Sequence, residues 1–336
     1  MVSSTPEKNP NSDLFKNKSS FIDSLLGRVK VEEPDNYFEN IQTKVSNQIS
    51  NHKSFYRIIK KIYTVYAQIF GPFHVLPDFL VLGSGACGTT SLVELYLRSN
   101  PEIIPSNNNE IFFFDINYKK SLNWYKLFFP TYIRKYCRKI IGKKTLVCEA
   151  TGNYFFHPYA PERIKKSLPN VKLILMMRNP VERTFSQYRR QVRNGFQTLS
   201  FEEALEKETA LYEKEFKKFL ENEDLEKDVD TRISIIARSR YSEALERWLK
   251  YFEKSNFLFI NSDSYFKNPI DEYSRILSFL ELSPHNPVVT GKRGINPSEI
   301  YKNIQLRNDT REKLKKYFVP WNNKLFNLIG EQFDWK

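Results

Sequence analysis

The sequence is short of cysteine, histidine and glycine, and each shortage excludes a kind of protein. Its three cysteines (Cys87, Cys137 and Cys148) have no CxxC spacing and do not cluster with its four histidines. This excludes a disulfide framework and argues against a zinc site, so we expect a reduced, intracellular protein. With 11 glycines and 17 prolines in 336 residues, the chain is neither collagen-like nor of low complexity.

Long hydrophobic runs are also missing. Residues 1–20 lack the apolar core of a secretion signal. The best candidate for a membrane span, Phe55 to Phe73, contains Arg57, Lys60 and Lys61. It is therefore not the run of about 20 apolar residues that a membrane-spanning helix needs. We expect no transmembrane segment and a cytoplasmic location.

The sequence does have enough apolar residues for a core and an excess of positive charge. It is 40% hydrophobic and 15% aromatic, which excludes wholesale disorder, and its formal charge is +13. Residues 116–145 hold nine Lys and Arg and no acid, whereas residues 200–230 hold twelve acids and five lysines. A basic surface suits an anionic partner such as a phosphate-rich cofactor, an anionic glycan, a phospholipid or nucleic acid. A solvated basic face explains the charge equally well.

Short apolar runs alternate with helical patterns along most of the chain. We predict strands over 78–83, 145–148, 171–177 and 258–260, and helices over 54–70, 89–99, 181–193, 201–226, 241–254 and 270–280. Strands that are apolar throughout and alternate with helices indicate the α/β class, with a parallel sheet flanked by helices. We divide the chain into an N-terminal extension, residues 1–76 (a mobile arm plus a packing helix), and one domain, residues 77–336.

A loop rich in small residues follows the first predicted strand. It reads GSGACGTTS from Gly83 to Ser91 and opens a helix, so its backbone N–H groups can point at a phosphate. The spacing resembles a Walker loop, GxxxxGK[ST], with Thr89 where the lysine would stand. The missing lysine argues against an ATPase, a GTPase or a kinase.

A second anion clamp follows the third predicted strand. Arg178 ends that strand, and Ser186 lies about two turns into the helix behind it. Open α/β sheets bind ligands at the carboxyl ends of their strands. Two clamps on neighbouring strand ends indicate a ligand with two separated phosphate groups.

The segments around these two clamps resemble the cofactor signatures of sulfotransferases that use 3′-phosphoadenosine 5′-phosphosulfate (PAPS). The first runs from Pro77 to Ser91, and the second, RNPVERTFSQY, runs from Arg178 to Tyr188. Further likeness lies in EIFFFD (110–115), EATGNY (149–154), YSEALERW (241–248) and GKRGINP (291–297). The heparan-sulfate and carbohydrate branch looks most similar. The resemblance implies a P-loop NTPase-like sulfotransferase fold and PAPS as the donor, with no metal required.

The resemblance also implies roles for particular residues. The 5′-phosphosulfate would be held by the loop, namely Ser84, Gly85, Ala86, Cys87, Gly88, Thr89, Thr90 and Ser91. Arg178 and Ser186 would bind the 3′-phosphate, and Tyr241 would help to bound the nucleotide pocket. A late loop would bring Lys292 to the phosphosulfate as a catalytic cation, with Arg293 and Gly294 beside it.

Glu110 matches the general base of the family. Sulfuryl transfer removes a proton from the acceptor O–H or N–H group, and a carboxylate with a raised pKa is suited to accept it. His157, near a strand end, is a rival base, although a lone histidine before proline is more often structural.

The chain departs from the family pattern at several positions that carry cations. Ala86 stands where the loop usually has a lysine, and Asn109 and Ala150 replace two further lysines. Phe112 replaces a histidine that often follows the base. Losing one transition-state donor typically costs about 10²- to 10³-fold in rate. Either another cation substitutes, with Lys292 and Arg293 the best candidates, or the chain binds the nucleotide and transfers poorly.

Three functional hypotheses follow. The first is an active sulfotransferase whose acceptor is a carbohydrate or a small hydroxyl- or amine-bearing metabolite, with residues 116–145 bordering the acceptor entrance. The second is a protein without efficient transfer: either a catalytically weak protein that binds PAPS or its product 3′,5′-adenosine bisphosphate (PAP), or a binding module that holds an anionic polymer such as a glycan through residues 116–145. The third is a nucleotide kinase, which the absence of the loop lysine disfavours. We expect no nucleic-acid partner. The aromatic residues within 116–145 recur at near-helical spacing, which favours a place in the core.

Overall fold

The computed structural model describes residues 53–140, 144–208, 235–287 and 304–335. Contacts divide the chain into two compact units, Met1–Lys60 and Lys61–Lys336, and the sheet with the helices that cover it belongs to the second. Most of the predicted N-terminal extension and all of Lys292, Arg293 and Gly294 lie outside the described residues. The division of the chain at residue 76 stays a prediction.

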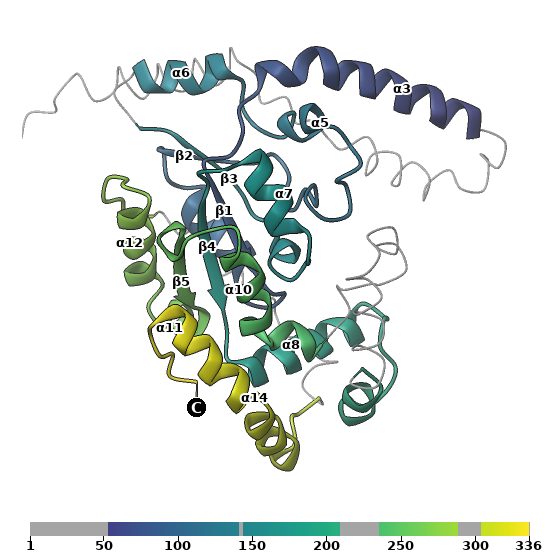
Figure 1. The fold of residues 1–336 in the computed structure, drawn as a ribbon, viewed down its shortest axis with the longest axis vertical. Coiled ribbons are helices and arrows are strands. Elements are labelled where there is room, and N and C mark those ends of the chain that lie inside the picture. Colours follow the sequence, from purple (N-terminus) through teal and green to yellow (C-terminus); the bar gives the residue numbers. More distant parts are fainter. Residues whose placement is uncertain (1–52, 141–143, 209–234, 288–303, 336) are drawn as a thin grey trace, which may run out of the picture. The chain divides into compact units, whose positions relative to one another are not determined.

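A five-stranded parallel sheet forms the centre of the described chain (Figure 1). Its strands are β1 (Phe79–Gly83), β2 (Ile103–Pro105), β3 (Leu146–Glu149), β4 (Lys172–Met177) and β5 (Phe257–Asn261), in the spatial order β2-β3-β1-β4-β5. In the register, Leu80 of β1 lies opposite Leu173 of β4 and Glu149 of β3. The predicted parallel sheet is confirmed. The three-residue β2 is the strand that the sequence did not predict.

Alternate residues of each strand enter two separate cores, so helices cover both faces of the sheet. Leu80 and Leu82 of β1 join a cluster with α7 (Ala160–Ser167), α10 (Tyr241–Leu249) and the end of α14 (Asn308–Ile329). Phe79 and Val81 join a cluster with the helical segment after β1, α11 (Ser262–Lys267) and α12 (Pro269–Phe279). Figure 1 shows α12 beside the sheet on one flank and α10 across it on the other.

For the remaining elements, the helices predicted from the sequence are present, but several of their bounds differ. These remaining elements are α3 (Lys53–Phe70), the single turns Gly71–Phe73, Gly152–Phe155, Ala237–Ser239 and Lys254–Asn256, α5 (Leu122–Lys126), α6 (Tyr132–Ile140) and α8 (Pro180–Arg193). The helix predicted over 89–99 is α4 (Thr89–Ser91) followed by a π-helix over Leu92–Leu97. The helix predicted over 241–254 ends at Leu249. The acidic helix predicted over 201–226 is described only to Glu208.

Helix α8 begins at a specific capping arrangement directly after β4. The side chain of Asn179 accepts a 3.0 Å hydrogen bond from the Val181 N–H group, and Pro180 occupies the first turn. Val181 and Phe185 then pack in a third core with Leu314 and Phe318 of α14. The cap and this core fix the direction in which α8 leaves the sheet.

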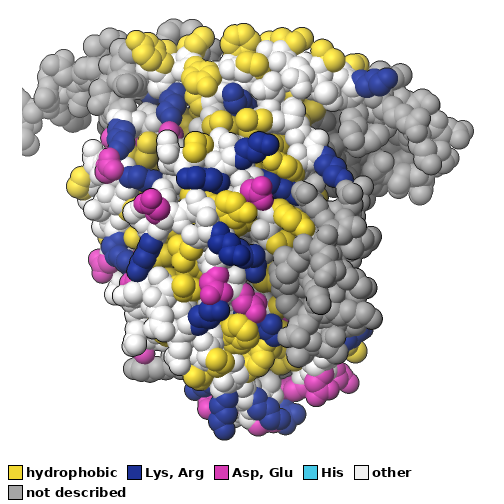
Figure 2. Space-filling model, viewed as in Figure 1, with side chains coloured by type: hydrophobic (Ala, Val, Ile, Leu, Met, Phe, Trp, Pro, Cys, Tyr) yellow, Lys and Arg dark blue, Asp and Glu magenta, His cyan; other side chains and the backbone are white. Residues whose placement is uncertain are grey.

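Exposed apolar side chains lie on α3 and α6, along the upper edge of the view in Figure 2. On these two helices they are Ile62, Val65, Tyr66, Ile69 and Phe70 of α3 and Tyr132, Ile133 and Tyr136 of α6. The prediction that the aromatic residues of 116–145 belong to the core is correct for Trp124 and Tyr125, which are buried. It is wrong for Tyr132 and Tyr136. Within the described ranges, no helix combines the length and the apolar character needed to cross a membrane.

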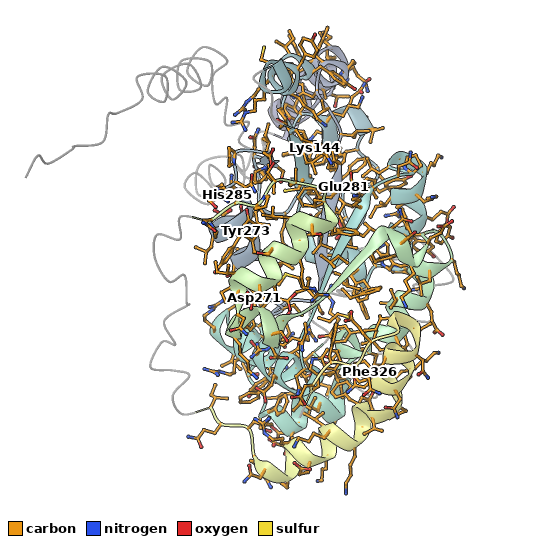
Figure 3. The ribbon with its side chains drawn as sticks, turned by 90° about the vertical axis from the view of Figure 1, so that its left-hand side faces the viewer. Lys144, Asp271, Tyr273, Glu281, His285 and Phe326 are labelled. Atoms are coloured by element: carbon orange, nitrogen blue, oxygen red, sulfur yellow. The ribbon has the colours of Figure 1, made fainter. Side chains whose placement is uncertain are left out.

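Part of the basic stretch lies at the amino ends of the strands. Lys135 makes a 2.7 Å ion pair with Asp78, the residue before β1. Lys144 and Lys172 pair with Glu281 at 3.3 and 2.8 Å, beside a cavity of about 410 Å³ (Figure 3). The predicted anion clamps lie at the opposite edge of the sheet. The expectation that residues 116–145 border the acceptor entrance is therefore wrong for Lys135 and Lys144, whose charges neutralise Asp78 and Glu281.

Candidate functional site

The candidate site lies at the carboxyl ends of β1 and β4. From β1 the chain crosses to β2 and β3 on one side, whereas from β4 it continues to β5 on the other. The crevice between two strands whose connections diverge in this way is where open α/β sheets bind ligands. The loop after Gly83 and the side chain of Arg178 both belong to this crevice, so the structure brings the two predicted clamps together.

The loop between β1 and α4 turns sharply at two positions with positive φ. Ala86 has φ +74° and Gly88 has φ +89°, and the Cys87 N–H group donates to Ser84 O at 3.2 Å. The left-handed region is unfavourable for alanine because of its Cβ atom, whereas glycine adopts it without this penalty. The first helical hydrogen bond after the loop runs from Leu92 N–H to Gly88 O at 3.0 Å. The N–H groups of residues 89–91 come before this bond, in the first turn, where N–H groups have no acceptor within the helix.

Side chains from three elements hold consecutive carbonyl groups of this loop. Arg183 Nε of α8 donates to Gly85 O at 3.1 Å, and Arg178 Nη1 donates to Ala86 O at 3.4 Å. Ser262 Oγ of α11 donates to Cys87 O at 2.7 Å. In a trans peptide the N–H group points away from the preceding carbonyl. The N–H groups of Ala86 and Gly88 thus point away from Arg183 and Ser262.

Tyr241 holds the backbone of Arg178, and Asp263 holds its side chain and the residue that follows it. The buried Tyr241 hydroxyl donates to Arg178 O at 3.0 Å and accepts from Arg178 N–H at 3.3 Å. Asp263 Oδ1 lies 3.7 Å from Arg178 Nε, and Asp263 Oδ2 accepts from Asn179 N–H at 2.8 Å. The Tyr241 hydroxyl therefore holds the backbone of Arg178, and its place at the nucleotide pocket stays a prediction.

The other predicted loop residues differ in what their side chains do. Cys87 is buried 3.7 Å from the Tyr241 hydroxyl, and burial raises the pKa of its thiol, which excludes a thiolate nucleophile at neutral pH. Ser91 Oγ lies 3.1 Å from the Tyr265 hydroxyl. Thr90 is exposed, and Ser186 is half-buried on α8.

Glu110 lies next to the start of the loop. Its Oε1 accepts a 3.4 Å hydrogen bond from the Gly152 N–H group. A Cβ atom on Gly152 would lie 2.8 Å from Gly83 O and 3.9 Å from Glu110 Oε1, so these three residues are in contact. The structure therefore brings Glu110 to the edge of the loop between β1 and α4.

The environment of Glu110 raises the pKa of its carboxyl group. The side chain is solvent-exposed by area, yet the surrounding protein partly desolvates the carboxylate, and this is the largest effect. The Gly152 hydrogen bond and the charges of Arg190 and Arg238 act in the opposite direction, and Asp115 adds to the increase. A carboxylate with these surroundings is suited to accept a proton near neutral pH.

A buried cluster around Glu149 holds the backbone that follows Glu110. Glu149 accepts hydrogen bonds from the hydroxyls of Thr151 (2.6 Å), Tyr154 (2.7 Å) and Tyr125. Thr151 Oγ1 in turn accepts from Ile111 N–H at 3.1 Å, and the Tyr154 hydroxyl accepts from Phe113 N–H at 2.7 Å. Burial raises the pKa of Glu149 to about 7. The cluster thereby supports the turn at Phe112, whose φ is +54°.

His157 does not share the surroundings of Glu110. Its ring is 2% exposed and lies 6.0 Å from the ring of Tyr159. A buried imidazole is out of reach of an acceptor that approaches from solvent. This favours the structural interpretation of His157.

The sequence predictions missed several charged residues at this site. Arg183 is wholly buried under the loop, Arg190 lies beside Gly85, and the charge of Arg238 acts on Glu110. A signal for two of them was present, because Arg183, Ser186 and Arg190 recur at spacings of three and four, which place them on one face of a helix. Which face meets the loop depends on the packing of α8.

The described residues contain no group of three His, Cys, Asp or Glu side chains placed to hold a metal ion. The buried polar atoms beside the loop that make no hydrogen bond within the described chain include the donors Ser84 Oγ, Arg178 Nε and Arg183 Nη2. Buried orphan donors are costly, so their presence points to a polar ligand. They fit an anionic, oxygen-rich group.

Comparisons with known proteins agree with this geometry. Residues 76–333 match a family model described as "Sulfotransferase domain". The chain is 30% identical to heparan sulfate glucosamine 3-O-sulfotransferase 6 of Mus musculus, over 77% of this chain and 73% of that protein. It is 26% identical to the membrane-associated sulfotransferase kil1 of Dictyostelium discoideum, over 78% and 67% of the two chains.

A solved structure is also similar. The sulfotransferase from Alicyclobacillus acidocaldarius superposes with a TM-score of 0.57 at 26% identity, covering 77% of this chain and 98% of that one. The similarity thus extends from the sequence to the arrangement of sheet and helices.

Proposed function

The chain belongs to the sulfotransferase domain family and is a sulfotransferase, and from this we propose that it transfers a sulfuryl group from PAPS to a hydroxyl or amine of a carbohydrate. The carbohydrate class is supported by the relatives named as heparan sulfate glucosamine 3-O-sulfotransferases. The observation that carries the proposal is that the loop after β1, Arg178 and Glu110 all lie at one edge of the sheet.

The donor site fits a ligand with two anionic ends. The N–H groups of residues 86, 88 and 89–91 would bind the 5′-phosphosulfate, and Arg178 with Ser186 would bind the 3′-phosphate. The orphan atoms Ser84 Oγ and Arg183 Nη2 support a polar occupant. When bound, PAPS supplies an activated sulfuryl group. The protein's own residues then have to bind PAPS and the acceptor, orient them, and take up the proton of the acceptor.

Glu110 would act as the general base. As the acceptor oxygen or nitrogen forms its bond to sulfur, its proton moves to a Glu110 carboxylate oxygen. The bond between sulfur and the bridging oxygen breaks, and its electron pair stays on the 5′-phosphate of the product, 3′,5′-adenosine bisphosphate (PAP). The desolvation that raises the pKa of Glu110 makes it a stronger base than an exposed carboxylate.

The test measures PAP release from PAPS in the presence of heparan sulfate, with mass spectrometry of the glycan. We expect transfer by the wild-type protein and loss of transfer, by at least about 10²-fold, in Glu110→Gln. PAP should still raise the melting temperature of that variant. Glu246→Gln, which removes a carboxylate paired with Lys324 on the surface, is the matched control.

Two results would overturn parts of this proposal. Normal turnover by Glu110→Gln would remove the assigned base. Stabilisation by ATP and magnesium but not by PAP would favour the kinase alternative. If heparan sulfate is not modified, a panel of small hydroxyl- and amine-bearing acceptors separates the two acceptor classes. The cytoplasmic location expected from the sequence stays a prediction, since one relative is named as membrane-associated.

A further inference from the structure

Sulfuryl transfer leaves negative charge on the bridging oxygen, and a cation beside that oxygen lowers the barrier. The loop that would hold the phosphosulfate, residues 83–91, contains no Lys or Arg, and neither Asn109 nor Ala150 supplies a charge. The cation in this chain therefore has to come from another element. Lys292 and Arg293, the candidates from the sequence, lie outside the described residues, and four arginines around the loop lie within them.

Three of these arginines are committed to other contacts. Arg178 contacts Asp263 and Ala86 O, and the resemblance assigns it to the 3′-phosphate. Arg183 is wholly buried and donates to Gly85 O, Ile235 O and the Ser239 hydroxyl. Arg238 is buried against Asn153. Each of these three guanidinium groups already has a partner in the described chain.

Arg190 differs from the other three. It is exposed on α8, four residues beyond Ser186, and its Nη1 lies 3.7 Å from the position of a Cβ atom on Gly85. Its charge acts on Glu110 on one side and on Arg183 on the other. Within the described chain its guanidinium makes no hydrogen bond or ion pair. Arg190 is thus an exposed cation beside the loop, and its charge also acts on Glu110.

We propose that Arg190 supplies the positive charge that faces the transferred sulfuryl group and its leaving oxygen, in a chain whose loop carries no lysine. The inference rests on the proposed function and deepens it. The guanidinium stabilises the charge that appears on the bridging oxygen as the sulfur–oxygen bond breaks. It accepts no proton, because the acceptor proton moves to Glu110.

The position of Gly85 supports this role. A Cβ atom there would lie 2.7 Å from Gln187 Oε1, which would have to shift, and 3.7 Å from Arg190 Nη1, which is ordinary contact. A side chain longer than alanine at residue 85 would therefore compete with the guanidinium for the space beside the loop. The Arg190 side chain reaches this space because residues 183, 187 and 190 share one face of α8.

The first experiment compares turnover and nucleotide binding. In Arg190→Gln we expect PAP formation to fall about 10²- to 10³-fold. The affinity for PAP should change less than about threefold, while the affinity for PAPS should fall about tenfold or more, because only PAPS has the sulfuryl group. Arg190→Lys keeps the charge and should recover most of the rate. Arg193→Gln, an exposed arginine in the last turn of α8, is the control and should leave both affinities and turnover within about twofold.

A second readout does not depend on turnover. The charges that act on Glu110 come from Arg190, Arg238 and Asp115. Removing the Arg190 charge should raise the pKa of Glu110, because a nearby cation favours the carboxylate. NMR titration of the Glu110 carboxyl carbon measures this in wild type, Arg190→Gln and Arg193→Gln.

The outcomes separate this inference from the proposed function. Equal losses of PAP and PAPS affinity in Arg190→Gln, or turnover within threefold of wild type, would overturn the role of Arg190. An increase in acceptor KM with unchanged kcat would assign Arg190 to acceptor binding and would also overturn it. If the wild-type protein transfers nothing to any acceptor, the proposed function fails, and the PAPS-to-PAP affinity ratio still decides whether Arg190 faces the sulfuryl group.

Discussion

Arg183 Nε donates a hydrogen bond to Gly85 O across 98 residues of sequence, at a distance of 3.1 Å. The arginine is wholly buried, and burial lowers its pKa. A charged group is thus placed under the loop, where its other donors hold Ile235 O and the Ser239 hydroxyl. One side chain links the loop between β1 and α4 to α8 and to the segment before α10.

Replacing Arg183 should damage stability and donor binding together. Arg183→Met leaves Gly85 O and Ile235 O buried without their donor, so we expect the free energy of unfolding to fall by about 3 kcal/mol. The affinity for PAP should also fall, since the loop loses its support. Urea unfolding and calorimetric titration with PAP measure the two effects. Arg193→Met removes an exposed arginine of the same helix and should change neither; unchanged unfolding of Arg183→Met would contradict the prediction.

Two glycines with positive φ allow a matched comparison. Gly88 (φ +89°) belongs to the loop, and a Cβ atom there would lie 2.9 Å from the Phe266 ring. Gly195 (φ +73°) follows α8 and has no atom within 4 Å of that position. Either change to alanine should cost about 1 kcal/mol of stability for the backbone conformation. Gly88→Ala should cost more and should weaken PAP binding severalfold, and equal effects of the two variants on PAP binding would argue against the loop as the donor site.

The buried carboxyl group of Glu149 should make stability depend on pH. Its pKa is about 7 when folded, against an ordinary value of 4.5, so the folded state holds the proton more tightly. Stability should therefore fall as pH rises from about 4.5 to about 7, by at most about 3 kcal/mol from this group, and then level off.

Thermal or urea unfolding across that range tests the prediction with two variants. Glu149→Gln should flatten the decline. Glu281→Gln is a contrast, because the Lys172 and Lys144 contacts lower the pKa of this exposed carboxyl group. Its contribution is present above the ordinary pKa and is lost as pH falls, which is the opposite sign. A decline of the same size in wild type and Glu149→Gln would exclude Glu149 as its origin.

A lysine in the loop should compensate for the loss of Arg190. Ala86 already has φ +74°, so Ala86→Lys adds a charge without a new backbone conformation. In an Arg190→Gln background we expect Ala86→Lys to raise the rate of PAP formation at least about tenfold. Ala86→Leu adds bulk without charge and should recover nothing. Equal rates for the two double variants would show that charge beside Gly85 does not limit transfer.

The sequence was sufficient to predict β1, β4, the loop between β1 and α4 and the position of Arg178. These features follow from local patterns, namely continuous apolar strands, small residues in a turn and a charged residue at a strand end. The strand β2 was missed because three residues, Ile103 to Pro105, form no recognisable period.

The partners of the charged side chains could be identified only from the tertiary structure. Nothing in the sequence near Glu149 indicates that Tyr125, 24 residues earlier, donates to it. In the same way, the sequence places Lys135 in a basic run after the base, but packing brings it to Asp78 at the other edge of the sheet. Helical spacing relates Ser186 to Arg190, and only the packing of α8 brings Arg190 beside Gly85.

The Glu149 cluster has a consequence for how such a protein changes over generations. It supports the turn after Glu110 through Thr151 and Tyr154, whereas the loop after β1 is supported by Arg183 and Ser262. The two halves of the site are thus held by different side chains, although they meet where Gly152 contacts Gly83 and Glu110. Exposed residues of 106–118 other than Glu110 can change without removing any of the side-chain contacts that hold the loop after β1. The residues around Glu110 can in this way diversify while the loop keeps its support.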